Sequence, residues 1–470
     1  MKLRFAFVCC LCAAGLQAQE DALKKMDAKA GAYGDLALQI WDWAEMGYKE
    51  EKSAALLQKT LEDAGFRIRK GVAGIPTAFV AEFGSGSPVI GILGEYDALP
   101  GLSQQAVPEK QPAGGAAGHA CGHHLFGTAS AAAAIAVKEW LQDNGQRGTI
   151  RFYGCPAEEG GSGKVYMVRA GLFDDLDAAL HWHPDDSNNA NPGAALANKS
   201  AKFRFHGISA HAAGAPERGR SALDGVEAMN YMVNLMREHI PQETRIHYVI
   251  TDGGKAPNVV PDFAEVYYYA RHDTRKEVIE VFDRIVKAAE GAALGTGTTM
   301  DYEIIGGTHE LLPNLALQEV MYRNLQAVGG ITYTPEEAIF AGKIAQSLGR
   351  DNLQPGEASR IEPLQEVGRA DGSTDVGDVS FTVPTAGLSA ATWVPGTPAH
   401  SWQAVAAGGT GIGTKGMMVA AKTLAATAID LMSDPETLAR AKAEFAERRG
   451  PDFKYVPLLG DRQPALDYRD

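Results

Sequence analysis

The chain has 470 residues, of which 45% are hydrophobic and 22% are charged, a composition typical of soluble globular proteins. This length exceeds that of one ordinary hydrophobic core, so two or more domains are expected. The formal net charge of −14 excludes the basic surface that nucleic acids and anionic membranes require, so neither is an expected partner.

The first 18 residues have the pattern of an export signal. Lys2 and Arg4 form a basic start, residues 5–16 are mostly apolar, and Ala18 offers a small residue for cleavage. The apolar run is too short for a permanent membrane span. We therefore expect residues 1–18 to be a signal peptide and the mature chain to be periplasmic or secreted, without a membrane anchor. The alternative is a buried first helix.

Two of the five cysteines, Cys121 and Cys155, lie beyond this segment. In an exported protein two cysteines often form a disulfide. We instead expect a metal-binding role for Cys121, because His123 follows two residues later, and a buried apolar role for Cys155.

Predicted strands and helices alternate through the first 197 residues. Helices are expected within residues 21–66, and strands 77–83 and 89–93 flank a Gly- and Ser-rich turn that favours a hairpin. A helix over 127–144, a strand over 149–154, a short helix over 163–170 and a strand over 177–180 follow. This alternation predicts an α/β domain whose mixed, largely parallel sheet has helices on both faces. Its ligand site is expected at the carboxyl ends of the strands.

The pattern changes after residue 197. Strands over 200–206, 245–251, 263–272 and 299–305 and helices over 219–239 and 275–293 follow one another in the order β-α-β-β-α-β. That order is typical of an α+β ferredoxin-like domain. We therefore predict a discontinuous catalytic domain, residues 19–197 and 310–470, with an inserted ferredoxin-like domain at residues 198–309.

Potential metal ligands follow successive strands of the first domain. Cys121 and His123 precede a predicted helix, Glu158 and Glu159 follow the next strand, and His181 and His183 end the one after. His400 lies in a turn-rich loop near the end of the chain. Thiolate, imidazole and carboxylate donors bind soft or borderline divalent ions. Each residue alone has an ordinary structural explanation, but together they predict a metal site.

Within this set the residues have different expected roles. Adjacent carboxylates such as Glu158 and Glu159 point in different directions, so one can bind metal while the other remains free as a base; the alternative is an exposed acidic turn. His183 is favoured over His181 as a ligand because it is nearer the strand end. Asp97 follows a strand and can orient a metal-binding imidazole, or is simply a turn residue.

Five motifs in this order resemble the M20 family of metallopeptidases and amidohydrolases, in the branch whose metal motif contains a cysteine. They are residues 94–100 (GEYDALP), 118–123 (GHACGH), 158–161 (EEGG), 257–262 (PNVVPD) and 395–402 (PGTPAHSW). The resemblance implies two divalent ions per subunit, zinc or manganese, and a base, Glu158, that activates the attacking water. It implies these ligands: Cys121, His123, Glu159, His183 and His400.

The same resemblance assigns roles to the inserted domain. In the wider family this domain forms a homodimer and supplies a histidine, here His211, to the partner's active site. Asn258 and Arg271 match positions that in relatives help to hold the substrate. Two positions depart from the pattern: His124 replaces an acidic residue common in the branch, and Glu95 stands where the wider family often has a metal-binding histidine. Cys121 is expected to compensate for the latter.

The expected activity is metal-dependent hydrolysis of an amide bond in N-acyl amino acids or dipeptide-like substrates such as p-aminobenzoyl-glutamate. Glu158 would act as the general base, His211 would donate a hydrogen bond to the developing oxyanion, and Arg271 would anchor a free carboxylate. Two alternatives remain. Cys121 could be the nucleophile of a thiol hydrolase with His123 as base, or the chain could be a catalytically idle binding protein or the partner subunit of a hydrolase complex.

Overall fold

The computed structural model describes residues 17–193, 195–350, 353–354, 356–365 and 372–469. The predicted signal peptide, residues 1–18, lies outside this part of the chain except for its last two residues, which begin a helical stretch over 17–28. Within the described ranges, no helix is both long and apolar enough to cross a bilayer.

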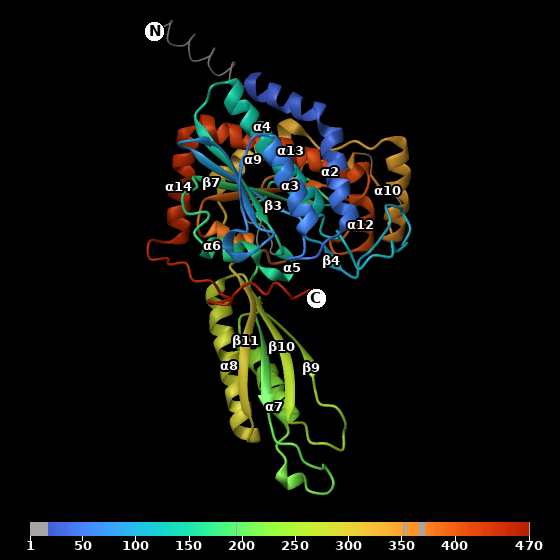
Figure 1. The fold of residues 1–470 in the computed structure, drawn as a ribbon, viewed down its shortest axis with the longest axis vertical. Helices are drawn as coiled ribbons and strands as arrows, with labels where there is room; N and C mark the ends of the chain where they lie inside the picture. The colour runs from blue at the N-terminus through green and yellow to red at the C-terminus, as the bar shows by residue number, and fades with distance from the viewer. Residues whose placement is uncertain (1–16, 194, 351–352, 355, 366–371, 470) are drawn as a thin grey trace.

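The molecule consists of a large unit and a slender unit that projects from it (Figure 1). The large unit contains a six-stranded sheet, and the slender unit contains a four-stranded one. The slender unit is formed by consecutive elements between residues 197 and 308, and the large unit by the chain on either side. The predicted fold class, an α/β unit with an inserted α+β unit, is confirmed.

The six-stranded sheet is mixed and largely parallel. Its central and far strands, β6, β3, β7 and β12, run parallel to one another, whereas β1 and β2 are antiparallel additions at one edge. In spatial order the strands are β1 (Arg67–Lys70), β2 (Phe79–Ser85), β6 (Gly148–Cys155), β3 (Val89–Glu95), β7 (Ala178–Asp185) and β12 (Thr385–Ala391).

The predicted hairpin between β2 and β3 is wrong. Strand β6 lies between them, antiparallel to β2 and parallel to β3. Seven of the eight residues of β6 are buried, so this strand requires neighbours on both of its edges and cover on both of its faces. The turn over residues 86–88 reverses the chain but is long enough to pass over one intervening strand. A turn motif predicts the reversal of a chain, not the strand with which it pairs.

Helices cover both faces of this sheet because its strands alternate apolar residues between two cores. Phe79, Ile92 and Phe152 face one core, and Val80 and Tyr153 face the other. Over the first core lie α2 (Ala30–Trp43), α3 (Glu51–Asp63), α4 (His123–Asp143), α9 (Leu315–Val328) and α13 (Gly411–Ser433); over the second lie α6 (Gly163–Arg169) and α11 (Val376–Ser380). The remaining elements of the large unit are β4 (Leu99–Pro100), β5 (Ala117–Gly118), α5 (Glu158–Gly161), α10 (Pro335–Ser347), α12 (Trp402–Gly408) and α14 (Pro435–Arg449).

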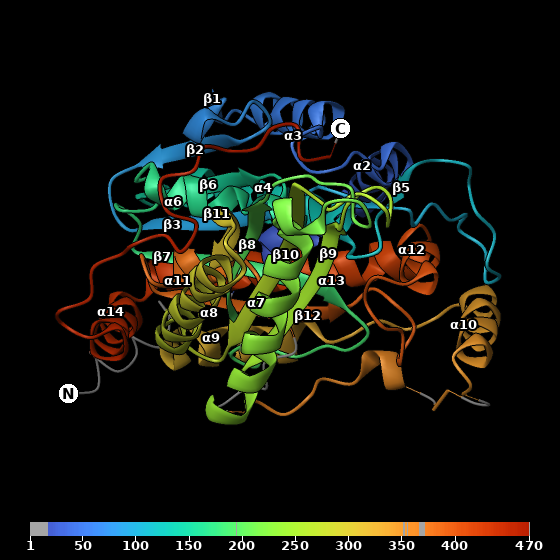
Figure 2. The ribbon, with the colours of Figure 1, turned by 90° about the horizontal axis from the view of Figure 1, so that it is seen from below.

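The slender unit has the predicted ferredoxin-like topology, with antiparallel strands in the order β11-β8-β10-β9. Figure 2 shows its two helices side by side in front of the strands. Ser221 and Thr274 cap these helices by accepting hydrogen bonds from backbone N–H groups. The elements are β8 (Ala197–His206), α7 (Ala222–Met236), β9 (Arg245–Asp252), β10 (Phe263–His272), α8 (Arg275–Thr296) and β11 (Thr299–Thr308).

Both cysteines of the described chain are buried and free, so Cys121 and Cys155 form no disulfide there. Burial raises the pKa of the Cys155 thiol to about 12, which keeps it protonated and inert. Cys155 thus has the buried apolar environment that the sequence analysis expected.

One buried carboxyl group makes the stability of the large unit depend on pH. Asp378 of α11 accepts hydrogen bonds from the His309 backbone N–H and the Tyr455 hydroxyl, and burial raises its pKa to about 7. The folded state therefore binds this proton more tightly than the unfolded chain, and the stabilisation is lost as the pH rises through 7. We expect Asp378→Asn to gain about 3 kcal/mol in unfolding free energy relative to the parent between pH 5 and pH 8. Denaturant unfolding of both proteins at the two pH values measures this, and a difference that does not change with pH would contradict it.

Candidate active site

A cavity of about 1050 Å³ opens at the carboxyl ends of β3, β6 and β7, where the slender unit meets the large one. Glu95, Glu158 and His183 line it from the large unit. Arg271 and Thr308 line it from the slender unit. This is the edge of a parallel sheet at which a ligand site is expected.

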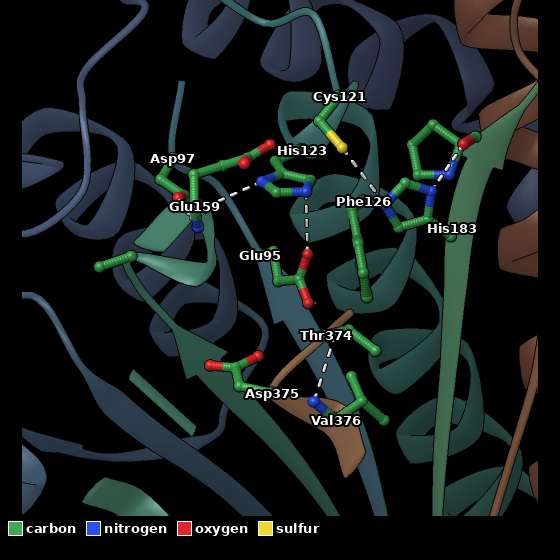
Figure 3. A network of polar contacts seen from close by, with 12 residues as sticks. Glu95, Asp97, Cys121, His123, Phe126, Glu159, His183, Thr374, Asp375 and Val376 are labelled. Atoms are coloured by element: carbon green, nitrogen blue, oxygen red, sulfur yellow. Dashed lines mark hydrogen bonds and ion pairs between the residues drawn. The ribbon is translucent and has the colours of Figure 1, made fainter. Parts of the chain in front are cut away.

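Cys121 and His123 are placed by the start of α4. Gly122 between them has a φ of +78°, and a Cβ there would approach Pro184 to 2.6 Å, so this position requires glycine. The His123 Nδ1–H donates to Asp97 Oδ1 over 2.8 Å, which directs Nε2 into the site (Figure 3). The second oxygen of Asp97 accepts the Glu159 backbone N–H at 2.9 Å. Asp97 therefore orients the imidazole and the turn that contains the two glutamates.

His183 extends from β7 toward Cys121. Its Nδ1–H donates to the Pro184 carbonyl over 2.7 Å, so Nε2 keeps its lone pair, and this atom lies 3.4 Å from Cys121 Sγ (Figure 3). Burial lowers the pKa of His183 to about 4, with the nearby His123 adding to the effect, so the ring is neutral. His181 also lines the cavity but belongs to none of the metal-donor groups of the described chain, and its ring lies against Gly387.

Glu158 and Glu159 occupy a tight turn, α5, directly after β6. Ala157 and Ser162 on either side have positive φ angles of 55° and 59°, which non-glycine residues rarely adopt. His400 is also at a positive φ, 58°, and its Nε2 lies 3.2 Å from Glu159 Oε1. Such strained backbone at a cluster of polar side chains is typical of functional sites.

The donor atoms form three groups in which every atom lies within 4.8 Å of the others. These groups are Cys121 with His123 and His183, Cys121 with Glu159 and His400, and Glu95 with His123 and Glu158. The first two groups share the thiol of Cys121. Together they contain all five residues that the sequence analysis named as ligands, so the structure brings that set together.

The site fits a divalent metal because several of its donor atoms are buried without a hydrogen-bond partner. They are His123 Nε2, Glu159 Oε1 and Glu95 Oε2. His123 Nε2 and Glu95 Oε2 are only 3.0 Å apart, but the two atoms are not aligned for a hydrogen bond. Buried polar atoms are rarely left unpaired. Atoms that are close together yet misaligned are arranged as ligands of a common central ion are.

Glu158 has the environment of a proton acceptor. Burial raises the pKa of its carboxyl group well above its ordinary value, and the neighbouring charges of Glu95 and Glu159 raise it further. A raised carboxyl pKa brings a base closer to neutrality, where proton transfer is most efficient.

A buried lysine near the glutamates was not anticipated by the sequence analysis. Lys164 of α6 is fully buried, and its Nζ lies 2.6 Å from Glu95 Oε1 and 2.7 Å from Asp375 Oδ1. It neutralises part of the acidic cluster and holds Glu95 with its other oxygen facing His123. A lysine followed by the apolar run 165–168 was the signal that could have revealed it.

Two predicted residues lie far from the cavity of their own chain. His211 and Asn258 are exposed at the distal tip of the slender unit, where their loops are joined by a bridge between His211 and Val259 (Figure 1). The His211 Nδ1 accepts hydrogen bonds from the backbone N–H groups of Ala213 and Gly214. A single chain therefore brings Arg271 to the cavity but neither of these two residues. His124 is buried, lies against Gly408 and does not line the cavity.

Comparison with known proteins identifies relatives of nearly the same length. Residues 197–296 match the model of the peptidase dimerisation domain. The chain is 45% identical to one of the two proteins named as subunits of the p-aminobenzoyl-glutamate hydrolase of Escherichia coli strain K12, over 94% of this chain and 97% of the relative. It is 29% identical to the Xaa-Arg dipeptidase of Mus musculus, over 90% of this chain and 91% of that one.

Solved structures with low sequence identity share the fold. An aminobenzoyl-glutamate utilization protein from Klebsiella pneumoniae superposes with a TM-score of 0.62 at 19% identity, covering 87% of this chain and 97% of that one. A dinuclear metal-binding peptidase from the M20 family of Bacillus subtilis superposes with a TM-score of 0.58 at 17% identity, covering 87% and 99%.

Proposed function

The chain belongs to the M20 family and is a hydrolase of its metallo-amidohydrolase and peptidase class, and from this premise we propose that it cleaves the amide bond of N-acyl amino acids such as p-aminobenzoyl-glutamate. The observation that supports this most is the pair of donor groups that share Cys121, within a cavity large enough for such a substrate. The relative with 45% identity is named for hydrolysis of this compound.

We propose that Cys121, His123, Glu159, His183 and His400 hold two divalent ions, zinc or manganese. Bound divalent ions lower the pKa of water and polarise the carbonyl of an amide. Glu158 accepts the proton of the attacking water and delivers it to the leaving nitrogen. Asp97 keeps His123 in the tautomer that presents Nε2 to the site.

His211 and Asn258 act, in this proposal, in the cavity of a second chain. Both are exposed at the tip of the slender unit, and the matched dimerisation domain includes them. In a homodimer His211 donates a hydrogen bond to the developing oxyanion, while Asn258 contacts the substrate. Arg271, which lines the cavity of its own chain, binds a substrate carboxylate. We further propose that the chain is exported, on the pattern of its first 18 residues.

The environment of Cys121 disfavours a thiol hydrolase. Burial raises the pKa of its thiol, whereas a nucleophilic cysteine needs a lowered one. An idle binding or partner subunit is disfavoured because the ligand set and Glu158 are both complete. A heteromeric complex with a different chain remains the alternative assembly, because the 45% identical relative is named as one of two subunits of its enzyme.

The proposal is tested by hydrolysis of p-aminobenzoyl-glutamate and a panel of N-acyl amino acids before and after chelation. We expect chelation to abolish turnover and added Zn²⁺ or Mn²⁺ to restore it, because the polarising charge is supplied by the ions. Release of p-aminobenzoate measures the rate. Turnover that survives complete metal removal would instead indicate thiol chemistry at Cys121.

A further inference from the structure

The segment after α14, residues 450–469, returns from the far side of the large unit to the cavity. Figure 1 shows it passing between the large and slender units and ending beside α5. Along this path the Tyr455 hydroxyl donates to Asp378 at 2.8 Å, and Arg462 Nη1 donates to the Ile304 carbonyl of β11 at 2.6 Å. The segment thus contacts both units before it reaches the site.

The surface under this segment is shaped to receive it. Leu459 is only 2% exposed, and a Cβ at Gly307 would come within 2.8 Å of Leu458. A Cβ at Gly47 would lie 2.1 Å from the Tyr468 hydroxyl. Two glycines are therefore required where the segment packs, so its path is a fixed part of the fold.

The last described residues of the segment hold the turn that contains the catalytic glutamates. Tyr468 Oη and Arg469 Nη2 both donate to the Glu159 carbonyl, at 3.0 and 2.7 Å. The Tyr468 ring packs edge-on against Tyr48, whose hydroxyl donates to the Gly161 carbonyl at 2.6 Å. These contacts fix the Arg469 guanidinium at the wall of the cavity.

Arg469 has unused hydrogen-bonding capacity. Its Nε is buried without a partner, and its guanidinium lies 4.7 Å from the centre of the Tyr468 ring. Arg271 is in the same condition, with a buried, unpaired Nε and its guanidinium 5.3 Å from the Tyr269 ring. Neither arginine forms an ion pair with a carboxylate of the described residues.

These two arginines are the only cationic side chains of Lys or Arg type among the described residues that line the cavity. The remaining charged lining is acidic: Glu95, Glu158, Glu159, Asp185 and Asp375. A partly buried guanidinium without a counterion is unfavourable, and its forked N–H groups match a carboxylate. Two such groups in one cavity provide places for two carboxylates.

We infer that Arg469 binds a second carboxylate of the substrate, in addition to the one bound by Arg271. The substrate class is then the N-acyl derivatives of acidic amino acids, and the C-terminal segment determines that specificity. This inference rests on the proposed amide hydrolysis and adds to it a residue and a selectivity.

The test compares p-aminobenzoyl-glutamate with p-aminobenzoyl-glutamine, which has the same shape but a neutral side-chain amide. We expect Arg469→Gln to lower kcat/KM for the glutamate compound by about 10- to 100-fold, mainly through KM, because one charge-assisted hydrogen-bonded pair is lost. The glutamine compound should change far less, so the preference between the two falls. Arg271→Gln should impair both.

Tyr468→Phe is the matched control, because it removes the other hydrogen bond to the Glu159 carbonyl without removing a charge. We expect it to change the two rates by the same factor and to leave the preference intact. If Arg469 only supports the turn, Arg469→Gln will behave like Tyr468→Phe, and that result would overturn the inference.

Calorimetric binding of the two compounds to the metal-loaded parent and to Arg469→Gln separates this inference from the proposed hydrolysis. Failure of the parent to hydrolyse either compound counts against the hydrolysis alone. A glutamate-over-glutamine binding preference that disappears in Arg469→Gln supports the inference even then. Equal affinities of the parent for the two compounds, or a preference that Arg469→Gln retains, would reject it.

Discussion

Glu158→Gln is expected to lower kcat for amide hydrolysis by about 10²- to 10⁴-fold, the usual contribution of a general base, while the bound metal per chain stays unchanged. Glutamine has nearly the same shape but cannot accept the proton of water. The expectation follows from the position of Glu158, whose carboxyl pKa is raised by burial and by the acidic neighbours Glu95 and Glu159. Single-turnover kinetics and metal analysis of the same preparation measure the two quantities.

Glu159→Gln is the matched control for this experiment. It alters the adjacent residue of the same turn, whose oxygen lies in the group with Cys121 and His400. We expect this variant to lose metal affinity together with activity. The assignment of the two roles would be wrong if Glu158→Gln lost metal while Glu159→Gln retained it.

His211→Ala is expected to lower kcat by about 10²- to 10³-fold, the typical effect of removing one oxyanion donor. Metal content should not change, because His211 lies at the distal tip of the slender unit, away from every donor group of the described chain. The same distance requires that the histidine acts on another chain.

Mixing the two inactive variants tests this requirement. A dimer of one Glu158→Gln chain and one His211→Ala chain contains one site with both residues intact, so random exchange of chains should recover about a quarter of the parental activity. The control is each variant mixed with itself, which should recover none. An absence of recovery after demonstrated exchange would place His211 outside the reaction.

Residues whose role depends on local spacing could be predicted from the sequence. Cys121 and His123 are separated by one glycine, and Glu158 and Glu159 are adjacent, so the backbone itself limits where their side chains lie. His183 was preferred to His181 because it is closer to the strand end, and its Nε2 lies 3.4 Å from the Cys121 sulfur. The ferredoxin-like unit was predictable for a similar reason, since six consecutive elements form it.

Features that depend on contacts between distant segments could not be predicted. The place of β6 between β2 and β3 is decided by burial of β6 on both faces, which no turn motif encodes. Lys164 meets Asp375 across 211 residues, and Arg469 meets Glu159 across 310. Pairs so far apart are brought together only by packing of the whole unit, and nothing in the local sequence of either partner names the other.

The competition between donor groups is the part of this account that is most open to direct measurement. Glu95 is 3.0 Å from His123 Nε2, so a third group, formed by Glu95, His123 and Glu158, competes with the two that share Cys121. If an ion occupied this third group, Glu158 would be a ligand and could not act as the base. The Lys164 Nζ, 2.6 Å from Glu95 Oε1, opposes that occupancy by neutralising Glu95.

The most direct test of the central claim is the anomalous difference map of crystals of the zinc-loaded protein, recorded on both sides of the zinc absorption edge. We expect two zinc peaks per chain, one bounded by Cys121, His123 and His183 and the other by Cys121, Glu159 and His400. A peak bounded by Glu95, His123 and Glu158, with none next to the Cys121 thiolate, would contradict both the proposed ligand set and the role of Glu158.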